Sequence, residues 1–225
     1  MKIAVIGTGN VGKALGGSFV KAGHDVTLAA RDAEKTKRVA WELGASAAET
    51  AAEAASAADV IVLAIPYGET DALEQDIGTE AVGKVVIDVT NPVAPDYSGL
   101  ATAGGPSGGE RVAKLFGGAR VAKAFNTVFA SVQADPKAHG TTVDALIATD
   151  DDEARSTVAE LASSIGFRPI DLGSLAAASE MEAIAWLNIR LQMQKNGDWR
   201  SSFVLVGAPE AAVAAPPREL AQLRR

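Results

Sequence analysis

Apolar runs of strand length alternate with segments of helical periodicity along most of the chain. The runs consist mainly of valine, isoleucine, leucine and alanine, which is typical of strands buried on both faces of a sheet. Strands are predicted at 2–6, 25–30, 59–65, 84–89, 120–124, 144–149 and 168–172. Helices are predicted at 10–22, 33–43, 47–57, 69–76, up to 116, after 150–153 and at 178–195. The order indicates an α/β fold, a Rossmann-like, doubly wound and mostly parallel sheet with a carboxy-terminal helix.

Only one internal segment interrupts this alternation. Residues 90–109 are rich in glycine and proline and predict a long irregular loop, which in a compact domain is usually functional or mobile. No linker or repeat is visible, so residues 1–207 are predicted to form a single domain. Residues 208–225 carry three prolines and two terminal arginines and are predicted to be a tail.

Composition narrows the chemistry. The formal charge is 21 − 28 = −7, which argues against binding to nucleic acid or to an anionic membrane surface. The chain has no cysteine and only two histidines, so a metal centre and a cysteine nucleophile are not expected. No apolar run approaches the length of a membrane span, and the expected location is the cytoplasm.

The first predicted strand runs directly into the sequence GTGNVG, Gly7 to Gly12, and then into a helix. In this setting Gly7 permits a tight turn, Gly9 lets the backbone approach a pyrophosphate, and Gly12 allows close helix–strand packing. The second strand ends at Arg31, where an arginine suits the 2′-phosphate of NADP and Lys35 adds a second positive charge. The alternative is that Asp32 binds the ribose of NAD, although Asp32 is also placed to cap the next helix.

The segments GTGNVGKAL, ARDAEK, VLAIP and VAKAFNT, with the helix ending at Asn196-Gly197, resemble the NADPH-dependent reductases of the deazaflavin coenzyme F420. The resemblance runs from Met1 to about Gly207, and the same fold unit occurs in six-transmembrane ferric reductases. It implies NADP(H) as cofactor, a deazaflavin as possible co-substrate and a homodimer. This chain departs from the family at Ala30, where a serine normally gives the phosphate one more hydrogen bond.

The resemblance also implies which residues contact NADP. The phosphate loop falls on Thr8, Gly9, Asn10 and Val11, and the 2′-phosphate site falls on Arg31 and Lys35. The nicotinamide half is implied to lie against four residues near strand ends: Ile65, Pro66, Asn91 and Ala130.

Residues for the second substrate are less clearly indicated. Asn126 and Thr127 either hydrogen-bond a second ring system or form a helix cap and turn, and Asn188 suggests a polar pocket wall or a subunit contact. Hydride transfer between two stacked ring systems needs no protein nucleophile and little acid–base help. No catalytic acid or base is therefore assigned.

The predicted function is hydride transfer between NADPH and a deazaflavin coenzyme. The first alternative is an NADPH-dependent reductase of flavins, quinones or ferric chelates, and the second is a non-catalytic NADPH-binding sensor. A flat, dry slot over the nicotinamide would favour an enzyme, whereas an exposed apolar patch without such a slot would favour the sensor.

Overall fold

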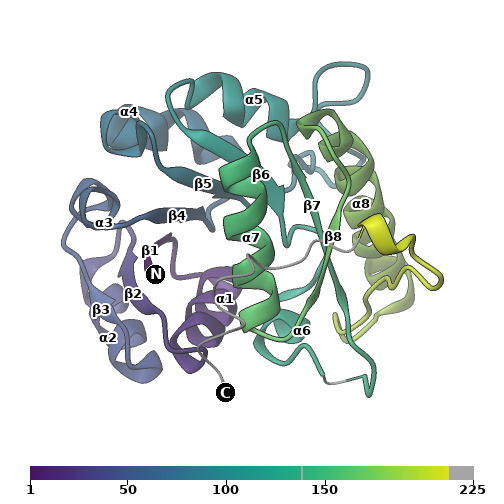
Figure 1. Cartoon of the computed structure of the whole chain (residues 1–225), viewed down its shortest axis with the longest axis horizontal. Coiled ribbons are helices and arrows are strands. Elements are labelled where there is room, and N and C mark those ends of the chain that lie inside the picture. The colour runs from purple at the N-terminus through teal and green to yellow at the C-terminus, as the bar shows by residue number, and fades with distance from the viewer. Residues whose placement is uncertain (138, 213–225) are drawn as a thin grey trace.

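The computed structural model describes residues 1–137 and 139–212. Its strands form one sheet in the order β3-β2-β1-β4-β5-β6-β7-β8 (Figure 1), parallel throughout except for the antiparallel pair β6–β7. The strands are β1 (Lys2–Ile6), β2 (Asp25–Ala29), β3 (Ser46–Ala47), β4 (Val60–Leu63), β5 (Val85–Asp88), β6 (Arg120–Ala124), β7 (Asp144–Thr149) and β8 (Arg168–Asp171). The predicted Rossmann-like, mostly parallel sheet is therefore confirmed.

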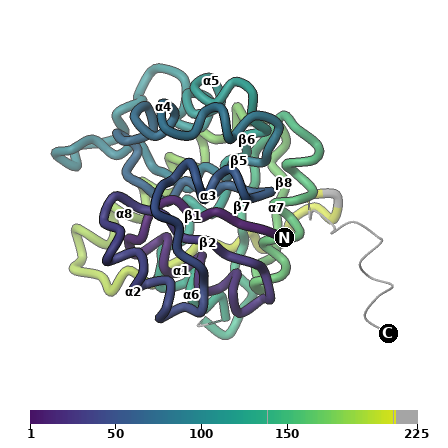
Figure 2. The backbone as a smooth tube through the Cα atoms, turned by 90° about the vertical axis from the view of Figure 1, so that its left-hand side faces the viewer, coloured from purple at the N-terminus to yellow at the C-terminus, as the bar shows by residue number. Residues whose placement is uncertain are grey.

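Helices cover both faces of the sheet. They are α1 (Asn10–Lys21), α2 (Ala33–Leu43), α3 (Ala51–Ala57), α4 (Thr70–Ala81), α5 (Gly108–Leu115), α6 (Ala130–Ala134), α7 (Asp152–Ser164) and α8 (Ala178–Lys195), with short 3₁₀ turns η1 (Tyr67–Glu69), η2 (Leu175–Ala177) and η3 (Glu210–Ala212). One buried cluster joins α1, α2, α6 and α7 to the sheet, and a second joins α3, α4 and α5 to the other face. Figure 2 shows α4 and α5 above the strands and α1 and α6 below them. Because these strands are parallel, their carboxyl ends meet at one edge of the sheet, where α/β folds bind ligands.

Most predicted boundaries agree with the structure to within one or two residues, but two segments differ. The helix predicted at 47–57 begins only at Ala51, after the short strand β3, because the Thr50 side chain accepts a hydrogen bond from the Glu53 backbone and caps it there. The helix predicted at 69–76 continues to Ala81. Most of the predicted tail, residues 213–225, lies outside the described residues.

Candidate functional site

The glycine loop between β1 and α1 has the geometry that its sequence predicts. Gly7 has φ +117°, and a Cβ on it would lie 2.1 Å from the Ala64 carbonyl oxygen. A Cβ on Gly12 would lie 1.9 Å from the Gly7 carbonyl oxygen, whereas one on Gly9 would meet nothing within 4 Å. Both close approaches require glycine, and the space above Gly9 leaves the first turn of α1 open. Its free backbone N–H groups and positive dipole end suit a pyrophosphate.

A groove of about 550 Å³ runs from this loop along the ends of β1, β2 and β4. At one end it is lined by Ala30, Arg31, Asp32 and Lys35, and at the other by Ile65 and Pro66. The Asp32 carboxylate accepts the Lys35 backbone N–H at 2.9 Å, so it caps α2 as the sequence suggested. Two cationic side chains and the aspartate that caps α2 thus lie together at this end of the groove.

The Arg31 guanidinium is not free at this end of the groove. Its Nη2 donates to Glu69 Oε1 at 2.9 Å, and Glu69, from η1, lines the same groove. The Arg31 side chain is 87% exposed, so this ion pair is screened by solvent and is weak. A phosphate that binds Arg31 must displace or accommodate Glu69.

Beyond β5 and β6 lies a second, smaller cavity of about 100 Å³. Two asparagines form its polar wall: Asn91 Nδ2 donates to the Asn126 carbonyl at 2.9 Å, and Asn126 Nδ2 donates to Asn91 Oδ1 at 3.0 Å. Asn126 Oδ1 is buried without a hydrogen-bond partner among the described residues, so it is available to a ligand donor. Further lining residues are Val11, Thr127, Ala130, Ala185 and Ile189.

The residues assigned from the sequence therefore fall into two groups. The groove is lined by Gly7, Thr8, Gly9, Arg31, Lys35, Ile65 and Pro66, and the small cavity is lined by Val11, Asn91, Asn126, Thr127 and Ala130. Asn10 and Gly12, in the first turn of α1, line neither of the two. Asn188 joins neither group. It is buried on α8, where its Nδ2 donates to the Ser201 carbonyl and its Oδ1 accepts from the Ser201 hydroxyl. These contacts attach the segment after α8 to that helix.

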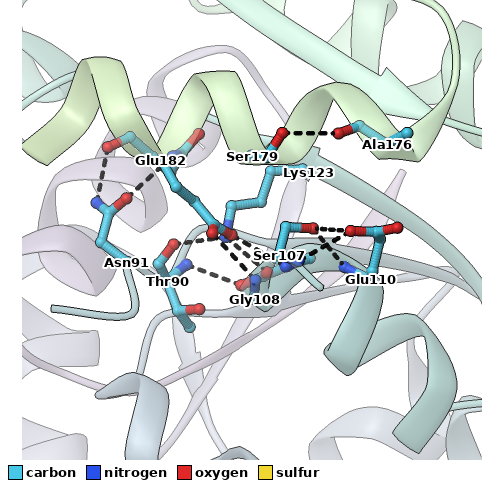
Figure 3. A network of polar contacts seen from close by, with 12 residues as sticks. Thr90, Asn91, Ser107, Gly108, Glu110, Lys123, Ala176, Ser179 and Glu182 are labelled. Atoms are coloured by element: carbon cyan, nitrogen blue, oxygen red, sulfur yellow. Dashed lines mark hydrogen bonds and ion pairs between the residues drawn. The ribbon is translucent and has the colours of Figure 1, made fainter. Parts of the chain in front are cut away.

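A buried charge cluster lies next to the small cavity, and the sequence analysis did not single it out (Figure 3). Lys123 on β6 places its Nζ 2.8 Å from Asp88 Oδ2, 2.7 Å from the Thr90 carbonyl oxygen and 3.0 Å from Glu182 Oε1. The three charged side chains are at most 1% exposed. The available signal was Lys123 and Asp88, each placed between apolar residues inside a predicted strand, 120–124 and 84–89.

Glu182 connects this cluster to α5. Its carboxylate accepts the backbone N–H groups of Gly108 and Gly109, each at 3.0 Å. The amino end of α5 is thereby satisfied, and its positive dipole end faces the carboxylate. A Cβ on Gly109 would lie 2.8 Å from Ala178 Cβ, so this close approach of α5 and α8 requires a glycine. Nearby, burial raises the pKa of the Tyr67 hydroxyl.

No helix in 1–137 or 139–212 is long and apolar enough to cross a membrane. Within that same part of the chain, no three histidine, cysteine, aspartate or glutamate side chains are grouped as metal ligands would be.

Comparison with known proteins places this geometry in a family. Residues 2–92 match the model of the family described as NADP oxidoreductase coenzyme F420-dependent. The chain is 33% identical over 184 residues to metalloreductase STEAP3 of Rattus norvegicus, covering 81% of this chain but only 36% of that protein. It therefore spans about a third of the length of that relative.

Two further similarities extend over nearly the whole chain. A crystal structure of an Arthrobacter sp. FB24 protein, provisionally assigned as an F420-dependent NADP reductase, superposes with a TM-score of 0.82 at 30% identity, covering 91% of this chain and 99% of that one. The F420-dependent NADP reductase of Methanothermobacter thermautotrophicus is 35% identical over 210 residues, covering 86% of this chain and 90% of the relative. With the glycine loop, the groove and the order of the strands, this identity shows that the chain belongs to the family of F420-dependent NADP reductases.

Proposed function

We propose that this protein is an oxidoreductase that transfers a hydride between NADP(H) and a deazaflavin coenzyme of the F420 type. The observation that carries the proposal is the succession of three features along one sheet edge: two cations, an open glycine loop and a cavity with an asparagine pair. Membership in a family whose named relatives are F420-dependent NADP reductases supports the same assignment.

The groove fits NADP(H) by the chemistry of its residues. Thr8, Gly9, Asn10, Val11 and Gly12 would hold the pyrophosphate against the first turn of α1. Arg31 and Lys35 would bind the 2′-phosphate, and Ile65 and Pro66 would contact the nicotinamide half of the cofactor.

At the other end, Asn91, Asn126, Thr127 and Ala130 would border the nicotinamide and the second ring system. The bound cofactor supplies a hydride that the deazaflavin accepts. The protein has to stack the two rings at about 3–3.5 Å and to exclude water, because a transfer between ring carbons needs no protein acid or nucleophile. Asn126 Oδ1 and Thr127 offer polar contacts to the ring edges, and we assign them to substrate orientation.

We also propose that the active form is a homodimer through α8. Leu187 and Leu191, one turn apart on this helix, are each 48% exposed. Phe203, Leu205 and Val206 add exposed apolar surface in the segment that follows it. A second copy would cover this surface, and α8 lies at the edge of the molecule, where a partner has access (Figure 1). Light scattering on the purified protein tests the assembly, and a monomer at working concentrations would contradict it.

A cytoplasmic location stays a prediction.

A ferric chelate is the second candidate acceptor, because the chain resembles STEAP3 over 184 residues. One spectrophotometric screen separates the candidates: NADPH oxidation is followed with a deazaflavin, FMN, FAD, a quinone, a ferric chelate and a simple ketone. We expect fast turnover with the deazaflavin and little or none with the ketone, since among the described residues no acidic, histidine, lysine or tyrosine side chain lines the small cavity. Fast ketone reduction without deazaflavin turnover would contradict the proposal, and turnover with the ferric chelate alone would favour the second candidate.

A further inference from the structure

We propose that the buried cluster of Lys123, Asp88 and Glu182 is a positioning device for the nicotinamide end of the site. No step of the proposed reaction uses these charges directly. Their contacts, however, reach both the polar wall of the small cavity and the helix that covers it.

All three Nζ–H groups of Lys123 have a partner in this arrangement. Nζ lies at 2.7–3.0 Å from Asp88 Oδ2, the Thr90 carbonyl and Glu182 Oε1, one oxygen for each donor. A buried ammonium with three oxygen partners has one low-energy position, because any displacement leaves an oxygen or an N–H unsatisfied in a dry environment. The cluster is consequently rigid.

The first path from the cluster leads to the asparagine pair. Asp88 Oδ1 accepts the Thr90 backbone N–H at 2.8 Å, so Asp88 and Lys123 together hold both polar backbone groups of Thr90. Asn91 is the next residue, and it pairs with Asn126, three positions after Lys123. Both members of the pair are thus held by chain segments that the cluster fixes.

The second path leads to α8. Glu182 is attached to Lys123 and to the Gly108 and Gly109 amides, and Ala185 and Ile189 lie one and two turns further along the same face of α8. Both of these apolar residues line the cavity. The position of the Glu182 carboxylate therefore sets how closely α8 approaches the small cavity in which the two ring systems would stack. Figure 3 shows this side chain extending from the helix into the cluster.

A Glu182→Gln substitution tests this role with the smallest change of shape. All the polar neighbours of the Glu182 carboxylate are hydrogen-bond donors. The amide NH₂ of a glutamine at this position must therefore face a backbone N–H or Lys123 Nζ. Two donors in contact force α8 or Lys123 to shift. The matched control is Glu180→Gln, the same change two residues earlier on the same helix at an exposed position.

Four readouts separate positioning from folding: the melting temperature, the affinity for 2′,5′-ADP, the nicotinamide fluorescence of bound NADPH, and kcat. For folded Glu182→Gln we expect affinity for 2′,5′-ADP within about threefold of wild type, because the adenosine end is distant. We expect kcat to fall about tenfold or more and the nicotinamide fluorescence to change, because misplaced rings react slowly. Glu180→Gln should behave as wild type.

Glu182→Asp keeps the negative charge beside Lys123 and should give an intermediate loss of kcat. Unchanged kcat and nicotinamide fluorescence in a folded Glu182 variant would overturn the proposal, as would failure of both Glu182 variants to fold, since the role would then be structural only. The inference rests on the proposed function for the identity of the acceptor. The fluorescence measurement needs no acceptor. A wild-type protein that does not reduce deazaflavin would therefore contradict the proposed function, but the fluorescence test of the Glu182 variants would remain valid.

Discussion

The two ends of the site are built from opposite kinds of polar structure. At the adenosine end, Arg31 is 87% exposed and pairs with Glu69 across an open groove. At the nicotinamide end, Lys123, Asp88 and Glu182 are almost completely buried and hold a turn and a helix in place. Exposed charges can recognise a phosphate and exchange partners at small cost, whereas buried charges fix geometry because they have no alternative partner. In the proposed site, recognition and positioning are therefore separated along one sheet edge.

The largest effect should come from breaking the buried cluster. Lys123→Met leaves two buried carboxylates without their cation and should lower the free energy of unfolding by about 3–5 kcal/mol. Urea denaturation measures the loss, with Lys114→Met, at an exposed position of α5, as the control that should change little. Adding Asp88→Asn and Glu182→Gln to Lys123→Met removes the unpaired charges and should recover part of the stability. A Lys123→Met variant as stable as the control would show that the cluster does not hold the turn and the helix in place.

The intermediate effect belongs to Arg31. A charge-assisted guanidinium contact to the 2′-phosphate is worth about 1.5–3 kcal/mol, so Arg31→Ala should weaken NADPH binding about tenfold or more. Binding of NADH, which lacks this phosphate, should hardly change. Lys35→Ala should cause a smaller loss, because a lysine ammonium cannot make the bidentate contact of a guanidinium and its flexible side chain loses entropy on binding.

Arg38→Ala is the matched control for Arg31, since Arg38 lies exposed on α2 and does not line the groove. Titration of each variant with both cofactors checks the prediction. Equal affinity of the wild type for NADH and NADPH would contradict it and would give the ribose contact to Asp32.

The smallest effect concerns Glu69. Because the carboxylate occupies Arg31 and would face the 2′-phosphate, Glu69→Gln should tighten NADPH binding by about two- to fivefold, the worth of one exposed ion pair. Glu74→Gln, on α4 outside the groove, controls for the loss of one charge. The same titrations measure the change. Weaker NADPH binding to Glu69→Gln would mean that the glutamate orients Arg31 for the phosphate.

Sequence patterns predicted the geometry of the glycine loop and its surroundings better than that of the small cavity and its buried charge cluster, for a physical reason. The glycine loop and Arg31 are local: their roles follow from a turn, a strand end and a helix start within about thirty residues. The small cavity joins residues that are far apart in the chain, such as Asn91, Asn126 and Ile189. Spacing alone does not bring such residues together.

The fold shows the same division. Buried strands were located from their apolar runs, and α8 was placed at its observed bounds, 178–195. The short strand β3 was missed because its two residues, Ser46 and Ala47, are too few to form an apolar run, and Ala47 was assigned to the predicted helix 47–57. Lys123 and Asp88 lie inside runs assigned as buried strands, and a charge there predicts a buried partner. Asp88 and Lys123 are paired in the register of the neighbouring strands β5 and β6. The third member, Glu182, depends on the packing of α8, which the periodicity of that helix does not determine.

The central claim is that this site moves a hydride directly from the cofactor to a deazaflavin. The most direct test uses NADPH deuterated at C4 on the transferred face, with the oxidised deazaflavin in ordinary water. We predict that the deuterium appears at C5 of the reduced deazaflavin, as read by mass spectrometry, because the protein excludes water and stacks the rings. A reduced deazaflavin that carries only solvent hydrogen, with both deuterated faces of NADPH tested, would contradict direct transfer in this site.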